Sequence, residues 1–321
     1  MKKAISLLIG SVVAQGLVAN AIADGPIDGT VYGKINTAII MEDGDAAGSD
    51  DTYLSNWSSR LGFKGKTKLD GGLYAIYKLE YGVSPDETAG KTSSDDAGDK
   101  QIFKQRNAYV GLQGEFGKIL AGTHDTPLKK TAGKIDMFDR LPNGDIKYVI
   151  VAQERINDLV HYTSPKIADA ITVKAATQLQ ENGDGNNGTS FSATYDKGAI
   201  FAAIGVDSDV VGYDTTRLAL QYKAKKYTAG IIYSMSEDAT VANAESKDGF
   251  IVSGSYKIDA FKLKAQYGAG DGKKKDAKLM AVGADYKLGE KTKLHGYLSS
   301  YEYYVADSKV TTLGFGMEHN F

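Results

Sequence analysis

Residues 312–321 read Thr-Leu-Gly-Phe-Gly-Met-Glu-His-Asn-Phe, and residues 73–81 read Leu-Tyr-Ala-Ile-Tyr-Lys-Leu-Glu-Tyr. In the first stretch the odd positions are apolar apart from His319, and the even positions are small or polar. In the second stretch the odd positions are again apolar, while Lys78 and Glu80 occupy even positions. Successive side chains of a strand point to opposite faces, so the pattern predicts strands with one apolar and one polar face.

The same alternation recurs along much of the chain. Clear examples are residues 171–179, 250–258 and 261–267. No stretch carries the 3.6-residue apolar period over three helical turns. The sequence therefore predicts an all-β protein.

The composition narrows the class of protein. Among 321 residues there are 38 basic and 40 acidic side chains, 37 glycines, 20 tyrosines, 5 prolines and no cysteine. The lack of cysteine excludes a disulfide scaffold and a cysteine nucleophile. A protein that binds nucleic acid normally carries a basic surface, so the balanced charge argues against a nucleic-acid partner. The mean hydropathy of −0.29 fits a soluble protein, but a transmembrane barrel also averages apolar and polar faces to a negative value.

The N-terminus reads as an export signal. Lys2 and Lys3 precede an apolar run over residues 4–14, and Ala21-Ile22-Ala23 provides a small-residue cleavage site. The run is shorter than the ~20 apolar residues of a membrane-spanning helix. We predict a signal peptide over residues 1–23, with cleavage after Ala21 as an alternative, and a barrel domain over residues 24–321.

The connections between the predicted strands fall into two classes that alternate along the chain. The seven short ones lie at 70–71, 114–118, 164–170, 196–199, 224–226, 257–260 and 288–291. The eight long ones lie at about 43–54, 84–101, 124–156, 181–188, 207–215, 237–247, 270–277 and 304–309. This layout predicts a transmembrane antiparallel β-barrel of sixteen strands with short periplasmic turns and long extracellular loops. One miscounted hairpin would give fourteen or eighteen strands.

A sheet in lipid must close on itself because hydrocarbon cannot satisfy the polar groups of a free edge. The apolar parity then faces lipid, and a barrel of this size encloses water. Aromatic residues near strand ends are expected to form girdles at the membrane interfaces. The candidates are Tyr53, Tyr81, Tyr195, Tyr222, Tyr256, Tyr267, Tyr286 and Phe321.

Several segments taken in order resemble the Gram-negative general porins. The terminal aromatic Phe321, at the end of an alternating strand, resembles an outer-membrane assembly signal. The strand opening Val-Tyr-Gly-Lys at 31–34 and the segment Ser-Arg-Leu-Gly-Phe-Lys-Gly at 59–65 are similar to the first two porin strands. Arg-Asn-Ala-Tyr-Val-Gly-Leu at 106–112 is similar to the fourth, and the segments 116–118, 155–158 and 162–165 continue the likeness.

The third long loop, about 124–156, carries acids together with apolar residues. Ile135, Met137, Phe138 and Leu141 would not be needed in a purely exposed loop, so we expect the loop to pack onto a surface. The resemblance implies that it folds into the lumen and narrows it, with Asp136, Asp139 and Asp145 facing basic residues of the wall. The matching wall positions are Lys34, Arg60 and Arg106, and we add Lys78 and Arg155. The family's Pro-Glu-Phe-Gly segment is absent, which leaves ion selectivity open.

The expected function is therefore a water-filled outer-membrane channel for passive diffusion of ions and small hydrophilic solutes. Expected partners are outer-membrane lipid and lipopolysaccharide, the assembly machinery and, by resemblance, two further copies in a homotrimer with the loop at 84–101 as its latch. The formal charge of −4 after signal removal, with the loop acids, favours a mild preference for cations.

Two other functions stay open at this stage: a channel selective for sugars or anions, and a barrel enzyme. The four histidines are scattered at 124, 161, 295 and 319, and no serine elbow or metal-spaced pair accompanies them. We therefore expect no enzyme activity, no cofactor and no metal. The acidic run at 43–51 does not match a calcium loop.

Overall fold

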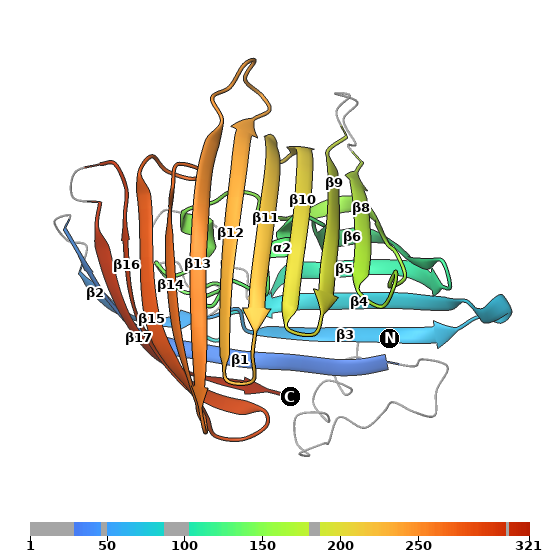
Figure 1. Ribbon diagram of the computed structural model, residues 1–321. Helices are drawn as coiled ribbons and strands as arrows, with labels where there is room; N and C mark the ends of the chain where they lie inside the picture. Colours follow the sequence, from blue (N-terminus) through green and yellow to red (C-terminus); the bar gives the residue numbers. More distant parts are fainter. Residues whose placement is uncertain (1–28, 46–49, 87–102, 180–186, 306–307) are drawn as a thin grey trace, which may run out of the picture.

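The computed structural model describes residues 29–45, 50–86, 103–179, 187–305 and 308–321, which form one antiparallel sheet closed into a barrel (Figure 1). The predicted signal peptide at 1–23 and most of the predicted latch at 84–101 lie outside these residues. Both remain predictions.

The strands follow one another around the barrel in chain order. Their bounds are β1 Gly29–Gly44, β2 Asp51–Asn56, β3 Arg60–Lys68, β4 Tyr74–Val83, β5 Phe103–Gly114, β6 Gly117–Asp125, β7 Arg155–Thr163, β8 Ile171–Gln178, β9 Thr189–Lys197, β10 Ile200–Val210, β11 Tyr213–Lys223, β12 Tyr227–Asp238, β13 Lys247–Ile258, β14 Phe261–Gly270, β15 Ala277–Lys287, β16 Thr292–Glu302 and β17 Val310–Asn320. The described residues also include three short helical turns, η1 Asp70–Gly72, α2 Lys129–Ala132 and η2 Ile146–Tyr148. In the described part of the chain, no helix has the length and apolar character to cross a membrane.

The first and last strands close the barrel. Strand β17 pairs with β1 from Lys34 opposite Asn320 to Gly44 opposite Val310. Both β2 and β3 pair antiparallel with β1, so they are two halves of one interrupted strand. The barrel therefore has sixteen strands, which confirms the predicted fold.

The interruption between β2 and β3 changes which side chains face inward. The register against β1 shifts by one residue there, and Ser58 adopts a φ of 60°. A shift of one residue exchanges the two faces of a strand. Tyr53 consequently packs inside the barrel beside the buried Ile40, so its prediction as an outer girdle residue was wrong.

Within the described residues, most of the predicted connections join consecutive strands, but one of them is wrong. The segment 207–215 is not a long loop, because β10 continues to Val210 and β11 begins at Tyr213. Val211 and Gly212 form a two-residue turn with φ values of 54° and 76°. Two positive φ values in succession match the twist of a tight hairpin.

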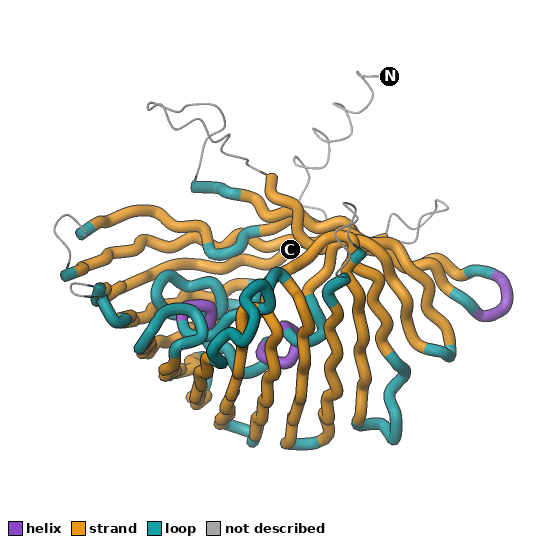
Figure 2. The backbone as a smooth tube through the Cα atoms, turned by 90° about the horizontal axis from the view of Figure 1, so that it is seen from above, coloured by secondary structure: helices purple, strands orange, loops and turns teal. Residues whose placement is uncertain are grey.

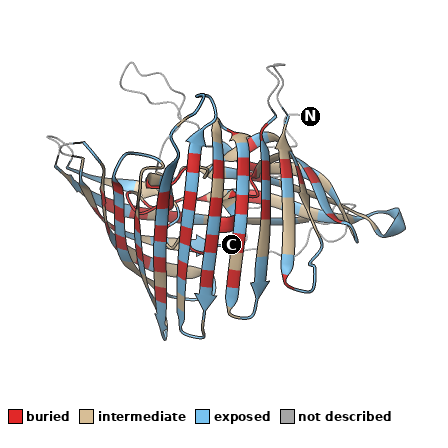
Figure 3. Ribbon diagram, turned by 45° about the horizontal axis from the view of Figure 1, so that its top comes forward, coloured by how far each residue is buried: buried red, intermediate tan, exposed pale blue. Residues whose placement is uncertain are grey.

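The two faces of the wall separate as the alternation predicts. Buried and exposed residues alternate along the strands (Figure 3), and the exposed set includes Leu79, Val110, Leu220 and Met280. The seven other predicted girdle residues are exposed on the outside: Tyr81, Tyr195, Tyr222, Tyr256, Tyr267, Tyr286 and Phe321. The outer face is therefore apolar and aromatic, as lipid requires.

Candidate functional site

The third loop, residues 126–154 between β6 and β7, lies inside the curved wall of strands (Figure 2). Its buried Ile135, Ile146 and Val149 pack on lumen-facing residues of β10 to β15, including Ile232 and Ile251. A second cluster packs Phe138 and Leu141 against Ala38, Ile40, Trp57, Ala281 and Tyr297. The apolar residues noted in the sequence thus hold the loop to the inner wall, as expected.

Wall side chains also bind the backbone of the loop. Ser253 Oγ donates to the carbonyl of Ile135 at 2.6 Å, and Gln266 Nε2 donates to that of Gly144 at 3.0 Å. Arg217, which is fully buried, donates from Nη2 to the carbonyl of Val151 at 2.6 Å. The loop backbone therefore has fixed partners on β11, β13 and β14.

The three predicted loop acids come together at the loop tip. Their carboxylates offer oxygen atoms that all lie within 4.8 Å of one another. Asp145 is buried and accepts from the backbone N–H of Arg140 at 2.7 Å and of Lys147 at 2.8 Å, so it braces the loop. Asp136 accepts from the N–H of Phe138 at 3.1 Å, and Asp139 is exposed.

This crowding changes the acidity of the two enclosed carboxyls. Burial, followed by the charges of Asp145 and Asp139, raises the pKa of Asp136 well above its ordinary value. Burial also raises the pKa of Asp145, although the N–H groups of Lys147 and Arg140 oppose the shift. Asp136 is thus the member that keeps its proton to the higher pH.

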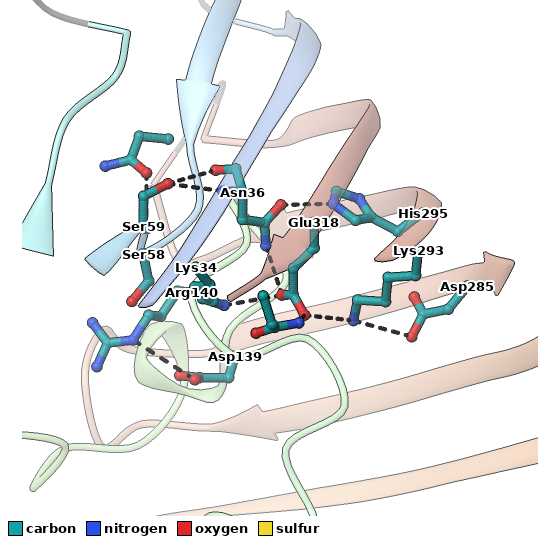
Figure 4. Close-up of polar contacts among 12 residues, drawn as sticks. Lys34, Asn36, Ser58, Ser59, Asp139, Arg140, Asp285, Lys293, His295 and Glu318 are labelled. Carbon is teal, nitrogen blue, oxygen red and sulfur yellow. Dashed lines mark hydrogen bonds and ion pairs between the residues drawn. The ribbon is translucent and has the colours of Figure 1, made fainter. Parts of the chain in front are cut away.

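A chain of ion pairs runs along the wall facing the loop tip (Figure 4). Lys34 Nζ lies 3.0 Å from Glu318, and Lys293 lies 3.8 Å from the same carboxylate and 3.5 Å from Asp285. Lys264 then pairs with Asp285 at 2.8 Å. The loop contributes Asp139 and Arg140, which lie 3.7 Å apart in the same view.

Three predicted wall cations belong to two compact clusters. Glu80 holds Arg106 at 2.8 Å and Lys78 at 3.1 Å. Arg155 lies 3.0 Å from Asp125, which also binds Lys129 and Lys130 at 3.1 and 2.7 Å. Each acid is thus outnumbered by its cations.

Arg60 differs from the other predicted cations. It lines the same cavity of about 180 Å³ as Asp136, Asp139, Arg140 and Lys34. Within the described ranges it makes no ion pair at 4.0 Å or less. Its charge therefore remains uncompensated by a close partner.

The wall below this cavity is basic. Lys64, Lys66 and Lys118 line a hollow beside the tyrosines Tyr77 and Tyr109, and none of the side chains around it is acidic. A fixed positive surface in a wet lumen concentrates anions.

Several charged residues of the site escaped the sequence prediction: Glu80, Asp125, Lys264, Asp285, Lys293 and Glu318. Asp125 is the last residue of β6. The other five lie at the alternate, polar positions of their strands, and this alternation could have identified them from the sequence. Their pairing depends on strands that are far apart in sequence. The structure also brings His124 and His161 to a ring distance of 4.9 Å, although they read as scattered.

A closed barrel with an apolar outer face, a charged interior and a loop folded inside it defines a membrane channel protein. Residues 8–320 match the family model described as Gram-negative porin. The major outer membrane protein P.IB of Neisseria gonorrhoeae is 24% identical over 334 aligned positions, which cover 100% of this chain and 90% of that protein. Outer membrane protein U of Vibrio vulnificus is 27% identical over 250 positions, covering 73% and 66%.

Solved structures share the fold. Salmonella typhi OmpF, in a complex with daunomycin, superposes with a TM-score of 0.71 at 15% identity, covering 92% of this chain and 98% of that one. The trimer form of Vibrio cholerae OmpT gives 0.65 at 19% identity, covering 92% and 100%. The chain belongs to the Gram-negative porin family and is an integral outer-membrane protein. Its function is that of a general porin channel, not of an enzyme.

Proposed function

We propose that the tip of the third loop and the charged wall opposite it form the constriction of this channel. The observation that carries the proposal is the cavity in which Asp136 and Asp139 of the loop meet Arg60 and Lys34 of the wall. Opposite charges across a narrow passage orient polar solutes and penalise apolar ones. Small hydrophilic solutes and ions would then pass by passive diffusion.

We further propose that anions pass this lumen more readily than cations. The net charge of the chain suggests the reverse, but ions in the channel respond to the charges that line it. Arg60, Lys64, Lys66 and Lys118 face the lumen without close acidic partners in the described residues, while Glu80 and Asp125 are each held by at least two cations.

Reversal potentials across a planar bilayer test this preference. In a tenfold potassium chloride gradient, the wild-type channel should give a potential of the sign set by chloride. The effect should weaken as salt rises above ~0.1 M, where the screening length falls below ~10 Å. A potential of the sign set by potassium would overturn the proposed preference while leaving the channel itself intact.

The oligomeric state and the partners that we propose follow from the family. The OmpT comparison includes a trimer form, which supports a homotrimer here as well. Outer-membrane lipid, lipopolysaccharide and the assembly machinery are the other proposed partners. Light scattering of the purified protein measures the oligomer directly, and a monomeric mass under non-denaturing conditions would contradict the trimer.

A channel selective for one sugar or one anion is the alternative. The basic wall supports the anion version of it. Conductance measured with increasing concentrations of an added sugar or anion separates the two. In a general channel the conductance follows ion size and charge, and it does not saturate at millimolar concentrations of the added solute.

A further inference from the structure

Three lysines share the basic hollow at the short-turn end of the barrel. Lys64 and Lys66 on β3 and Lys118 on β6 line this cavity of about 380 Å³. The short turn η1 follows β3, and Lys118 lies next to the turn between β5 and β6. Short turns of outer-membrane barrels lie on the periplasmic side. The cavity shares no residue with the one at the proposed constriction.

The strand register brings the three side chains to one face of the wall. Directly opposite residues on β4 and β5 connect Lys118 with Lys68 of β3. Opposite residues share a face, and so do residues two apart on one strand, which places Lys64 and Lys66 on the face of Lys118. Strands lie ~4.8 Å apart, so the backbones of Lys66 and Lys118 are ~14 Å apart, and those of Lys64 and Lys66 are ~7 Å apart. The three cations therefore form a broad triangle.

No carboxylate neutralises this triangle. Among the described residues, none of the three lysines makes an ion pair at 4.0 Å or less, and no acidic side chain lines the cavity. Lys64 Nζ lies 5.1 Å from the ring centre of Tyr32, and Lys66 Nζ lies 3.7 Å from that of Tyr74. An aromatic face orients an ammonium group but leaves its charge in place. All three lysines are exposed, so a solute can reach them.

Neutral polar side chains complete the lining. Thr30, Tyr109 and Gln113 provide hydroxyl and amide groups that can donate hydrogen bonds. Lysine ammonium groups add the stronger, charge-assisted hydrogen bonds to anionic oxygen atoms. The cavity thus combines three uncompensated cations with neutral donors, which is the chemistry of an anion site.

We propose that this cavity binds elongated small anions with three or more negative charges, the chemistry shared by linear oligophosphates and tricarboxylates. Separate anionic groups would contact Lys64, Lys66 and Lys118 at once, whereas a compact ion would reach only part of the triangle. The proposal rests on the basic lumen that underlies the proposed anion preference. The two fail separately, because the preference is measured by reversal potentials and the site by binding.

Titration calorimetry of the purified, folded protein tests the ligand class, below ~0.1 M salt so that screening is weak. The probes are tripolyphosphate, citrate, orthophosphate and acetate. Tripolyphosphate, citrate or both should bind at least tenfold more tightly than orthophosphate and acetate. The tighter of the two would identify phosphate or carboxylate as the preferred group. Binding of orthophosphate or acetate as tight as that of both larger anions would overturn the proposal.

Variants of the chain locate the site. Lys66→Gln with Lys118→Gln should weaken the tighter-binding anion at least tenfold and leave heat resistance unchanged, since neither lysine has an ion pair to lose. The matched control is Lys225→Gln with Lys226→Gln, which removes two charges from the short turn between β11 and β12, outside the cavity. It should change binding less than twofold. Unchanged binding in the first pair, or an equal loss in the control pair, would overturn the site.

Single-channel current distinguishes this cavity from the constriction. Millimolar tripolyphosphate on both sides of the bilayer should reduce the current of the wild-type channel and of Arg60→Ala, because Arg60 does not line this cavity. The current of Lys66→Gln with Lys118→Gln should be reduced much less. A block that is lost in Arg60→Ala but kept in the double lysine variant would place anion binding at the constriction and overturn the proposal.

Discussion

Asp136 lies at a place where the fold opposes a negative charge. The carboxyl is enclosed by the loop, accepts from Gln266 Nε2 at 3.3 Å and lies beside two more acids. Because burial and these neighbours raise its pKa, the folded protein favours the protonated form. The folded loop therefore gains stability as pH falls through that raised pKa, and it loses it as pH rises.

This sign gives a prediction for ion preference. Lowering the pH should neutralise Asp136 early, because burial and the neighbouring acids raise its pKa. As Asp136 loses its charge, the reversal potential should move towards the value set by anions. Asp136→Asn should lose this step in the pH profile, whereas Asp169→Asn in a distant turn should retain it. An unchanged pH profile in Asp136→Asn would contradict the assignment.

At the scale of elements, the third loop and the wall that it covers supply each other with packing and hydrogen-bond partners. Ile40, Ile251 and Leu279 are apolar residues on lumen-facing positions, and the loop buries them completely. The loop in turn uses wall side chains for its backbone hydrogen bonds. The covered half of the barrel is consequently a packed core, while the arc from β3 to β8 carries charged side chains, among them the buried ion-paired Glu80, Arg106 and Asp125.

Phe138 tests this attachment. Truncating a buried phenylalanine costs about 3–5 kcal/mol in a packed core, and here the loss falls on the loop because no strand pairing involves the ring. Phe138→Ala should raise single-channel conductance and current noise but leave the heat resistance of the barrel nearly unchanged. Phe116→Ala, at an exposed turn, is the control. A quiet current of wild-type size in Phe138→Ala would show that the loop is held without this anchor.

The seam between β1 and β17 provides a second element to test. Phe321 donates its N–H to the carbonyl of Gly33 at 3.0 Å, and Gly33 donates back at 3.2 Å. The ring covers Gly33 so closely that an added Cβ would lie 2.3 Å from it. Both residues therefore belong to the closure of the barrel.

We expect Phe321→Ala, deletion of Phe321 and Gly33→Val to reduce the folded, heat-modifiable form in the outer membrane without blocking export. Phe261→Ala removes an exposed aromatic of β14 and serves as control. Electrophoresis of unheated membrane fractions measures the folded form. Normal yields of all three seam variants would mean that the terminal residue is not needed for closure or assembly.

The elements also show what the sequence could predict. Alternation identified the lipid-facing residues and nearly every turn, because one face of each strand meets a uniform apolar solvent. It could not identify the face of Tyr53, because a register shift after Asn56 leaves no mark in the composition. It also could not pair Lys34 with Glu318, because that contact exists only when the first and last strands meet. The anchors of the third loop were visible as apolar residues, but their partners on β10 to β16 were not.

At the scale of the whole molecule, the distribution of charge matters more than its sum. The chain is slightly acidic, yet the lumen between the third loop and β3 to β8 is lined by cations, several without a close acidic partner in the described residues. The loop tip supplies the opposing acids. The proposed constriction therefore needs two charged surfaces that face each other across one narrow passage.

Single-channel conductance with reversal potentials, below ~0.1 M salt so that screening is weak, tests this requirement directly. Arg60→Ala should raise conductance and move ion preference towards cations, since this cation has no close partner to rearrange. Asp136→Ala with Asp139→Ala should also raise conductance but move preference towards anions. Phe116→Ala, outside the lumen, should change neither. Opposite shifts in selectivity with increased conductance in both cases are the predicted result, and unchanged selectivity in both would contradict the proposed constriction.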